Sequence, residues 1–69
     1  MINQGDILTL NDNRKYCVVF IAELNFKKYV YLVDQDNYMN TMFCEYGYEN
    51  DLEEVIDPAI IEQLLTKIF

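Results

Sequence analysis

The uninterrupted apolar run at residues 16–22 limits most strongly what this chain can fold into. It is far shorter than the ~20 residues that a helix needs to cross a bilayer. Its β-branched and aromatic residues favour a strand. Alternation would place Tyr16, Val18, Phe20 and Ala22 on one face and Cys17, Val19 and Ile21 on the other. Because both faces are apolar, the sequence predicts a central strand that is covered on both sides.

Further apolar segments, separated by turns rich in Asn and Asp, predict four more strands. Asn and Asp favour turns because their side chains bond nearby backbone and tolerate positive φ. The five strands are expected at residues 7–10, 15–23, 28–34, 38–46 and 52–56. In the fourth strand, Phe43 would face one way and Met42 and Cys44 the other. Asn25 is expected near the tip of a hairpin loop.

Asp57 and Pro58 mark the start of a helix over residues 58–68. The Asp57 carboxylate can accept the free amide hydrogens of the first turn, and Pro58 suits the first helical position. Five apolar residues at helical spacing, Ile60, Ile61, Leu64, Leu65 and Ile68, form one stripe. We expect this stripe to pack on the sheet, with a homodimer interface as the alternative.

Strands followed by a single helix place the chain in the mainly β or α+β class. Its 69 residues form one domain with a small core. A strongly coiled five-stranded antiparallel sheet of this size commonly closes into a small, partly open barrel. The helix would then cap an open end or cover one face. A closed barrel and an open sheet both remain consistent with the sequence.

The opening residues 5–8, which begin Gly5-Asp6, then a turn and residues 16–19, resemble the first hairpin of SH3-like small barrels. Residues 7–10, 28–32 and 52–57, before a terminal helix, look like segments of small acidic bacterial proteins of an uncharacterised domain-of-unknown-function class. Residues 38–46 are richer in Met and Tyr than that pattern. The resemblance implies a five-stranded SH3-like partly open barrel. It implies no reaction, because such barrels host many functions.

The charge of the chain argues against direct nucleic-acid binding. Twelve acidic residues against five basic ones give a net charge of −7. A phosphate-binding surface needs clustered Lys and Arg, whereas these cations occur at residues 14–15, 27–28 and 67. The same electrostatics disfavours an anionic membrane. A protein partner of basic character fits this charge better, and simple solubility is the alternative explanation.

The residues available for catalysis are few. The chain has no histidine, which is the usual general base and the commonest transition-metal ligand. Neighbouring acids such as Asp34 and Asp36 would matter only if burial raised one carboxyl pKa. We find no cofactor or metal motif and expect a protein that is not an enzyme.

The cysteines Cys17 and Cys44 lie 27 residues apart, which fits no metal motif. We expect them to be small buried hydrophobes in a reducing compartment, although neighbouring strands could join them in one disulfide. The N-terminus lacks the positive region and apolar core of a secretion signal, which favours a cytoplasmic location.

The acidic and aromatic residues around the fourth and fifth strands are candidates for binding a partner. Acidic residues there suit a basic partner, or they protect an edge strand from aggregation. Tyr and Met are enriched at interfaces, although large rings also fill small cores. The candidates are Tyr38, Met42, Phe43, Tyr46, Tyr48, Glu49, Asp51, Glu53 and Glu54.

These features favour a small, acidic, non-catalytic protein-interaction module. One alternative is an acidic nucleic-acid mimic that inhibits a basic DNA- or RNA-binding protein. The carboxylates lie mostly in the C-terminal part of the chain, rather than in a phosphate-like double row. Another alternative is a homo-oligomeric structural subunit that associates through its helix face.

Overall fold

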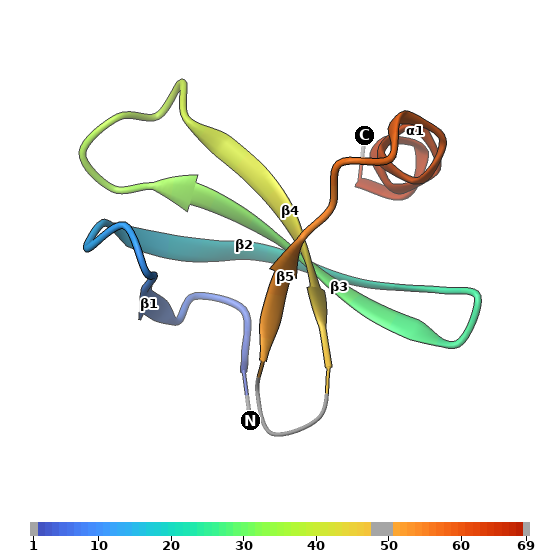
Figure 1. Cartoon of the computed structure of the whole chain (residues 1–69), viewed down its shortest axis with the longest axis horizontal. Helices are drawn as coiled ribbons and strands as arrows, with labels where there is room; N and C mark the ends of the chain where they lie inside the picture. The colour runs from blue at the N-terminus through green and yellow to red at the C-terminus, as the bar shows by residue number, and fades with distance from the viewer. Residues whose placement is uncertain (1, 48–50, 69) are drawn as a thin grey trace.

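The computed structural model describes residues 2–47 and 51–68, which form one antiparallel sheet and one helix (Figure 1). The elements are β1 (Ile7–Thr9), β2 (Lys15–Leu24), β3 (Lys27–Asp34), β4 (Thr41–Tyr46), β5 (Leu52–Glu54) and α1 (Pro58–Ile68). Each strand pairs with its neighbours in chain order, so β1 and β5 are the two edges. The sheet curls into a half-barrel. The predicted SH3-like partly open barrel with a C-terminal helix is therefore confirmed.

The start of β4 differs from the prediction. The strand begins at Thr41 rather than at residue 38, because Asn37 holds the preceding residues in a turn. The Asn37 side-chain oxygen accepts the Met39 amide hydrogen at 3.1 Å, and the Asn37 carbonyl accepts the Asn40 amide hydrogen at 2.9 Å. A side chain that bonds its own backbone in this way competes with strand pairing.

A β-bulge at Val19 changes the way that β2 faces. Val18 lies opposite Leu32, but Phe20 lies opposite Tyr31, so Val19 is an extra residue in β2. One extra residue inverts the alternation of every side chain that follows it. Val18 and Ala22 therefore point to opposite faces of the sheet.

Two hydrophobic clusters form on the two faces as a result. The inner cluster lies within the curl of the sheet and consists of Tyr16, Val18, Val30, Leu32 and Cys44. The outer cluster lies between the sheet and α1 and consists of Ala22, Tyr29, Phe43 and Leu64. Tyr31 and Phe43 stack in a tilted arrangement beside it, with ring centroids 4.8 Å apart.

The prediction that Tyr16, Val18, Phe20 and Ala22 share one face is wrong. Phe20 packs against the outer cluster, whereas Tyr16 and Val18 belong to the inner one. The prediction that both faces of β2 are covered is also only partly correct. Val19 is 41% exposed and Cys17 is half-buried, because α1 covers only the part of the outer face beyond the bulge.

The helix α1 begins as its sequence predicts. The Asp57 Oδ1 atom accepts the Ala59 amide hydrogen at 3.0 Å, which confirms the N-cap. Leu64 is fully buried, and Ile60, Ile61 and Ile68 pack against the outer cluster. Leu65 lies at the margin of the stripe and stays 39% exposed. No helix among the described residues has the length and apolar character needed to cross a membrane.

The turn between β2 and β3 has an unusual second residue. Asn25 and Phe26 have φ values of 53° and 66°, the left-handed pattern of a tight two-residue hairpin turn. Asn25 thus lies at the tip, as predicted. Glycine is usual where Phe26 stands, and a left-handed conformation costs a bulky residue about 1–2 kcal/mol. The Phe26 side chain is fully exposed and recovers none of this cost.

Candidate functional site

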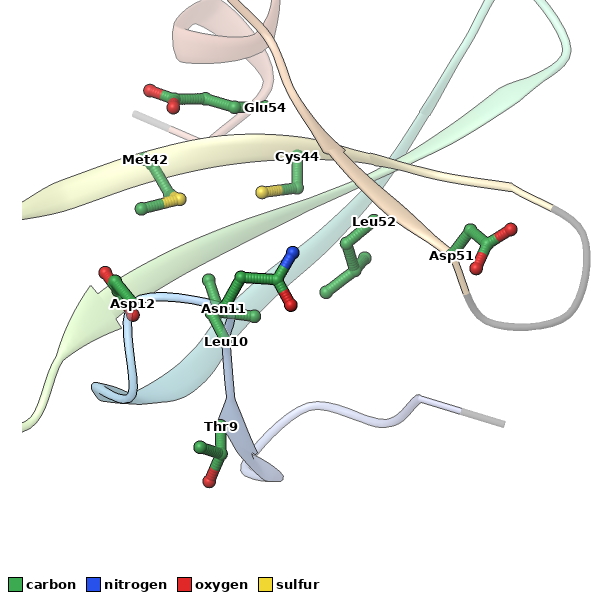
Figure 2. A pocket seen from close by; sticks show the side chains of 9 residues that line it. All are labelled: Thr9, Leu10, Asn11, Asp12, Met42, Cys44, Asp51, Leu52 and Glu54. Carbon is green, nitrogen blue, oxygen red and sulfur yellow. The ribbon is translucent and has the colours of Figure 1, made fainter.

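An open cleft of about 490 Å³ lies where the two edges of the sheet approach each other (Figure 2). One side is formed by the end of β1 and the turn after it, and the other side by β5. The strand β4 lies behind them. The lining residues are Thr9, Leu10, Asn11, Asp12, Met42, Cys44, Asp51, Leu52 and Glu54. The volume is in the range of sites that hold a small ligand or a few side chains.

The floor of the cleft is apolar. Leu10, Met42 and Leu52 are half-buried and pack against the inner cluster. In Figure 2, the sulfur atoms of Met42 and Cys44 both lie on the side of the cleft that faces Leu10 and Asn11. This floor is therefore the part of the inner core that the open barrel leaves accessible.

The rim of the cleft is acidic. Asp12, Asp51 and Glu54 are all exposed and come from two segments that are far apart in sequence. Within residues 2–47 and 51–68, no three His, Cys, Asp or Glu side chains lie close enough to hold a metal ion. The rim carboxylates thus surround the opening instead of converging on one point. Such an arrangement suits a cationic side chain above an apolar floor.

Hydrogen bonds within its own turn fix Asp12 at the rim. Its Oδ1 atom accepts the Arg14 amide hydrogen at 2.9 Å, and its Oδ2 atom accepts the Tyr16 hydroxyl at 2.8 Å. These two bonds lower the pKa of the Asp12 carboxyl, so the group keeps its charge. The bond to Asp12 likewise raises the pKa of Tyr16, which stays a neutral donor.

A buried carboxylate at Asp34 supports this turn. Asp34 accepts the Asp36 amide hydrogen at 2.8 Å, an Arg14 guanidinium hydrogen at 2.7 Å and an Asn40 amide hydrogen at 3.1 Å. These bonds, led by that of Asp36, hold the pKa of Asp34 at about 2. Asn40 also donates to the Tyr16 hydroxyl at 3.2 Å, which joins Asp34 to the bonds of Asp12.

We call the five side chains of Asp12, Arg14, Tyr16, Asp34 and Asn40 the Asp34 network. It links the turn after β1 to the end of β3 and to the loop before β4. The pairing with Asp36 does not raise the pKa of Asp34. The Asp34 pKa is lowered instead, because Asp36 contributes a backbone donor. The role of the network is to hold the two loops and the rim.

The two cysteines are free thiols on opposite faces of the sheet. Cys17 lies opposite Ile7 and Val33, whereas Cys44 lies opposite Val30 and Glu54. They are therefore not joined in the disulfide that the sequence left open. Burial, with a smaller effect from the Glu54 charge, raises the pKa of Cys44 to about 11. At neutral pH this thiol is an uncharged part of the cleft floor.

The structure divides the residues that the sequence selected as a partner surface. Met42, Asp51 and Glu54 meet in the cleft. Glu53 lies on the other face of β5, opposite Glu45, whose carboxylate is 3.6 Å from the Lys27 ammonium. Phe43 is only 6% exposed. Its ring belongs to the outer cluster and is not available as a surface.

The tyrosines among the candidates do not form one rim. Tyr38 is 81% exposed in the loop before β4, whereas Tyr46 is the last residue of that strand. They are thus separated by the length of β4. Tyr48 and Glu49 lie outside the described residues.

Sequence reasoning missed the contribution of the first turn. Leu10 and Asp12 belong to a segment that the sequence identifies only as a strand end and a turn. Nothing in the spacing of residues 9–12 and 51–54 indicates that they face each other. Only the curl of the sheet brings its first and last strands together.

Comparison of the chain with protein-family models, with curated proteins and with solved structures found no match in any of the three.

Proposed function

We propose that this protein is a non-catalytic interaction module that binds a basic, extended segment of a partner protein in the cleft between β1 and β5. The observation that carries the proposal is the combination of an apolar floor with three carboxylates around the same opening. An apolar side chain of the partner would lie over Leu10, Met42 and Leu52. Its Lys or Arg neighbours would face Asp12, Asp51 and Glu54.

The two sheet edges strengthen this proposal. β1 and β5 each pair with one other strand, so each presents backbone donors and acceptors on its free side. An extended peptide can pair with such an edge and place alternate side chains in a neighbouring pocket. The exposed carboxylates add attraction that salt screens. We therefore expect binding that weakens as the salt concentration rises.

The concave shape of the site favours this function over a nucleic-acid mimic. A mimic presents carboxylates outward along a surface, whereas these three surround a depression that can take in a side chain. We further propose a cytoplasmic location, where Cys17 and Cys44 remain thiols.

The test is an NMR titration with a short peptide in which one phenylalanine is flanked by lysines. Shifts should concentrate on the methyl groups of Leu10, Met42 and Leu52. The double variant Asp51→Asn, Glu54→Gln should weaken binding about tenfold, which corresponds to the loss of two exposed charge contacts. A peptide with glutamates in place of the lysines should not bind.

The matched control is Glu53→Gln with Glu62→Gln. It removes the same charge from two exposed positions that do not line the cleft. The control should bind the lysine peptide as the unmodified protein does. If both double variants weaken binding equally, the peptide senses only the net charge, and the cleft is not its site.

A further inference from the structure

The tip of the β2–β3 hairpin, residues 25–28, carries a ring that the fold does not use. Phe26 is fully exposed, and its φ of 66° is a conformation that bulky residues rarely adopt. A glycine would occupy this position without strain. An exposed aromatic side chain on a strained turn points to a contact outside the molecule.

The charge of the hairpin tip is opposite to that of the whole protein. Lys27 and Lys28 follow Phe26 directly, and both are exposed. They are two of the five basic residues in a chain of net charge −7. The Lys27 ammonium lies 3.6 Å from Glu45, yet its side chain keeps 60% of its surface exposed. An aromatic ring beside two cations therefore requires a binding site that is apolar inside and acidic around its opening.

The cleft between β1 and β5 has this character. Its floor of Leu10, Met42 and Leu52 can receive a ring, and its rim carries carboxylates. We propose that the hairpin tip of one molecule docks into the cleft of a second copy of this chain, with Phe26 on the floor and the two lysines facing the rim. This inference rests on the proposed function, because it takes the cleft to be a docking site.

The tip does not occupy the cleft of its own molecule, because Phe26 is fully exposed and is not among the lining residues. The tip follows Leu24 at one end of β2, and the turn with Asp12 precedes Lys15 at the other end. A ten-residue strand separates the tip from this side of the cleft by roughly 30 Å at about 3.3 Å per residue. Figure 1 shows the β2–β3 loop and the β1–β2 loop at opposite sides of the molecule. The contact is therefore between molecules and joins two different surfaces, so it continues head to tail or closes into a ring.

An anionic lipid surface is the other binding partner that an exposed aromatic ring beside two lysines could fit. We favour the cleft because it combines an apolar floor with carboxylates around one opening, which the ring and its two lysines require. The experiment includes this case, with vesicles of equal parts phosphatidylcholine and phosphatidylserine as the probe.

Two variants that each retain one half of the contact provide the test. Phe26→Gly removes the ring and relieves the turn, and Asp51→Asn with Glu54→Gln neutralises part of the rim. Sedimentation equilibrium of the unmodified protein at low salt should show association that rises with concentration and falls with added salt. Each variant alone should associate more than about tenfold more weakly. An equimolar mixture should form a heterodimer and stop there, since only one tip and one intact cleft remain.

The outcomes separate this inference from the proposed function. Unchanged association of Phe26→Gly, or a monomeric unmodified protein, overturns the head-to-tail contact. Binding of the tip to the vesicles without self-association overturns it as well. The lysine peptide is then added to Phe26→Gly, whose cleft is intact. If the peptide binds, the cleft remains a docking site for another partner; if it does not, the proposed function fails too.

Discussion

The two turns that flank β2 contain the same kind of backbone but differ in how they are stabilised. Asn13 and Asn25 both have positive φ, at 62° and 53°. Beside the first turn, Asp12 and Arg14 bond to Tyr16 and Asp34, and the Asp34 network joins three segments. Beside the second turn stands Phe26, strained and fully exposed.

The first turn contains residues that the fold requires, whereas the second turn contains a residue that the fold does not require. Asp12 and Arg14 of the first turn are explained by folding, because each of these side chains has a partner that holds the fold. Phe26 is not explained by folding, because a smaller residue would serve the turn better. The bulge at Val19 lies between the two ends and gives each half of β2 its own core.

Inserting one alanine directly after Val19 should have the largest effect. With the one-residue bulge at Val19 kept, the added residue would shift the alternation again, move Phe20 and Ala22 to the inner face and remove the surface on which α1 packs. A domain of this size has roughly 3–5 kcal/mol of stability, which this rearrangement should exceed. We expect the insertion variant to lose cooperative unfolding in urea and the dispersion of its amide NMR signals.

The matched substitution Val19→Ala keeps the residue count. Because Val19 is 41% exposed, this change should alter the free energy of unfolding by less than about 1 kcal/mol. An insertion variant as stable as Val19→Ala would show that the residue count of β2 does not set the two faces.

The Asp34 network should make the fold sensitive to acid. The pKa of Asp34 in the folded protein is about 2, below the ordinary value of 3.8. The ionised carboxylate therefore stabilises the fold above about pH 4, and this contribution is lost as the pH falls toward about 2. In that window, unfolding of the unmodified protein should take up about one proton more than unfolding of Asp34→Asn.

Urea unfolding measured between pH 2 and pH 5 at constant ionic strength would show this difference. The free energy of unfolding should change more steeply with pH in the unmodified protein than in Asp34→Asn. Asp36→Asn is the control, since only the backbone of Asp36 bonds to Asp34. Its pH dependence should follow that of the unmodified protein. The same slope for Asp34→Asn would mean that Asp34 is not the group responsible.

Phe26→Gly should have the smallest effect, and it should stabilise the protein. Relief of the left-handed strain, less the greater freedom of glycine when unfolded, leaves about 1 kcal/mol in its favour. Asn25→Gly should change stability by only a few tenths of a kcal/mol, because Asn tolerates this conformation. Urea unfolding at low protein concentration measures both. A loss of stability in Phe26→Gly would mean that the ring supports the fold.

Local signals were sufficient to predict many elements. The Asp57-Pro58 pair located the start of α1, and Asn25 located the tip of the long hairpin. The alternation in β4 also holds, with Phe43 in the outer cluster and Cys44 in the inner one. These features depend on capping, turn preference and strand periodicity, which act over a few residues.

The candidate site was predicted less well. Met42, Asp51 and Glu54 were among the selected residues and line one cleft, whereas Leu10 and Asp12, which also line it, were not selected. Phe43 was selected for its aromatic character, although its face of the sheet is covered by α1. The error has one source. A list of acidic and aromatic residues does not say which face of a curled sheet each one occupies.

By itself, the sequence determined the strands, the turns, the capped helix and the excess of negative charge, because these follow from short-range preferences and composition. The tertiary structure alone decided the rest. The extra residue at Val19 is only visible when β2 is paired with β3. The cleft exists only because the curl brings β1 near β5 and leaves them unjoined. Register and curvature are properties of strands packed together, so no single segment specifies them.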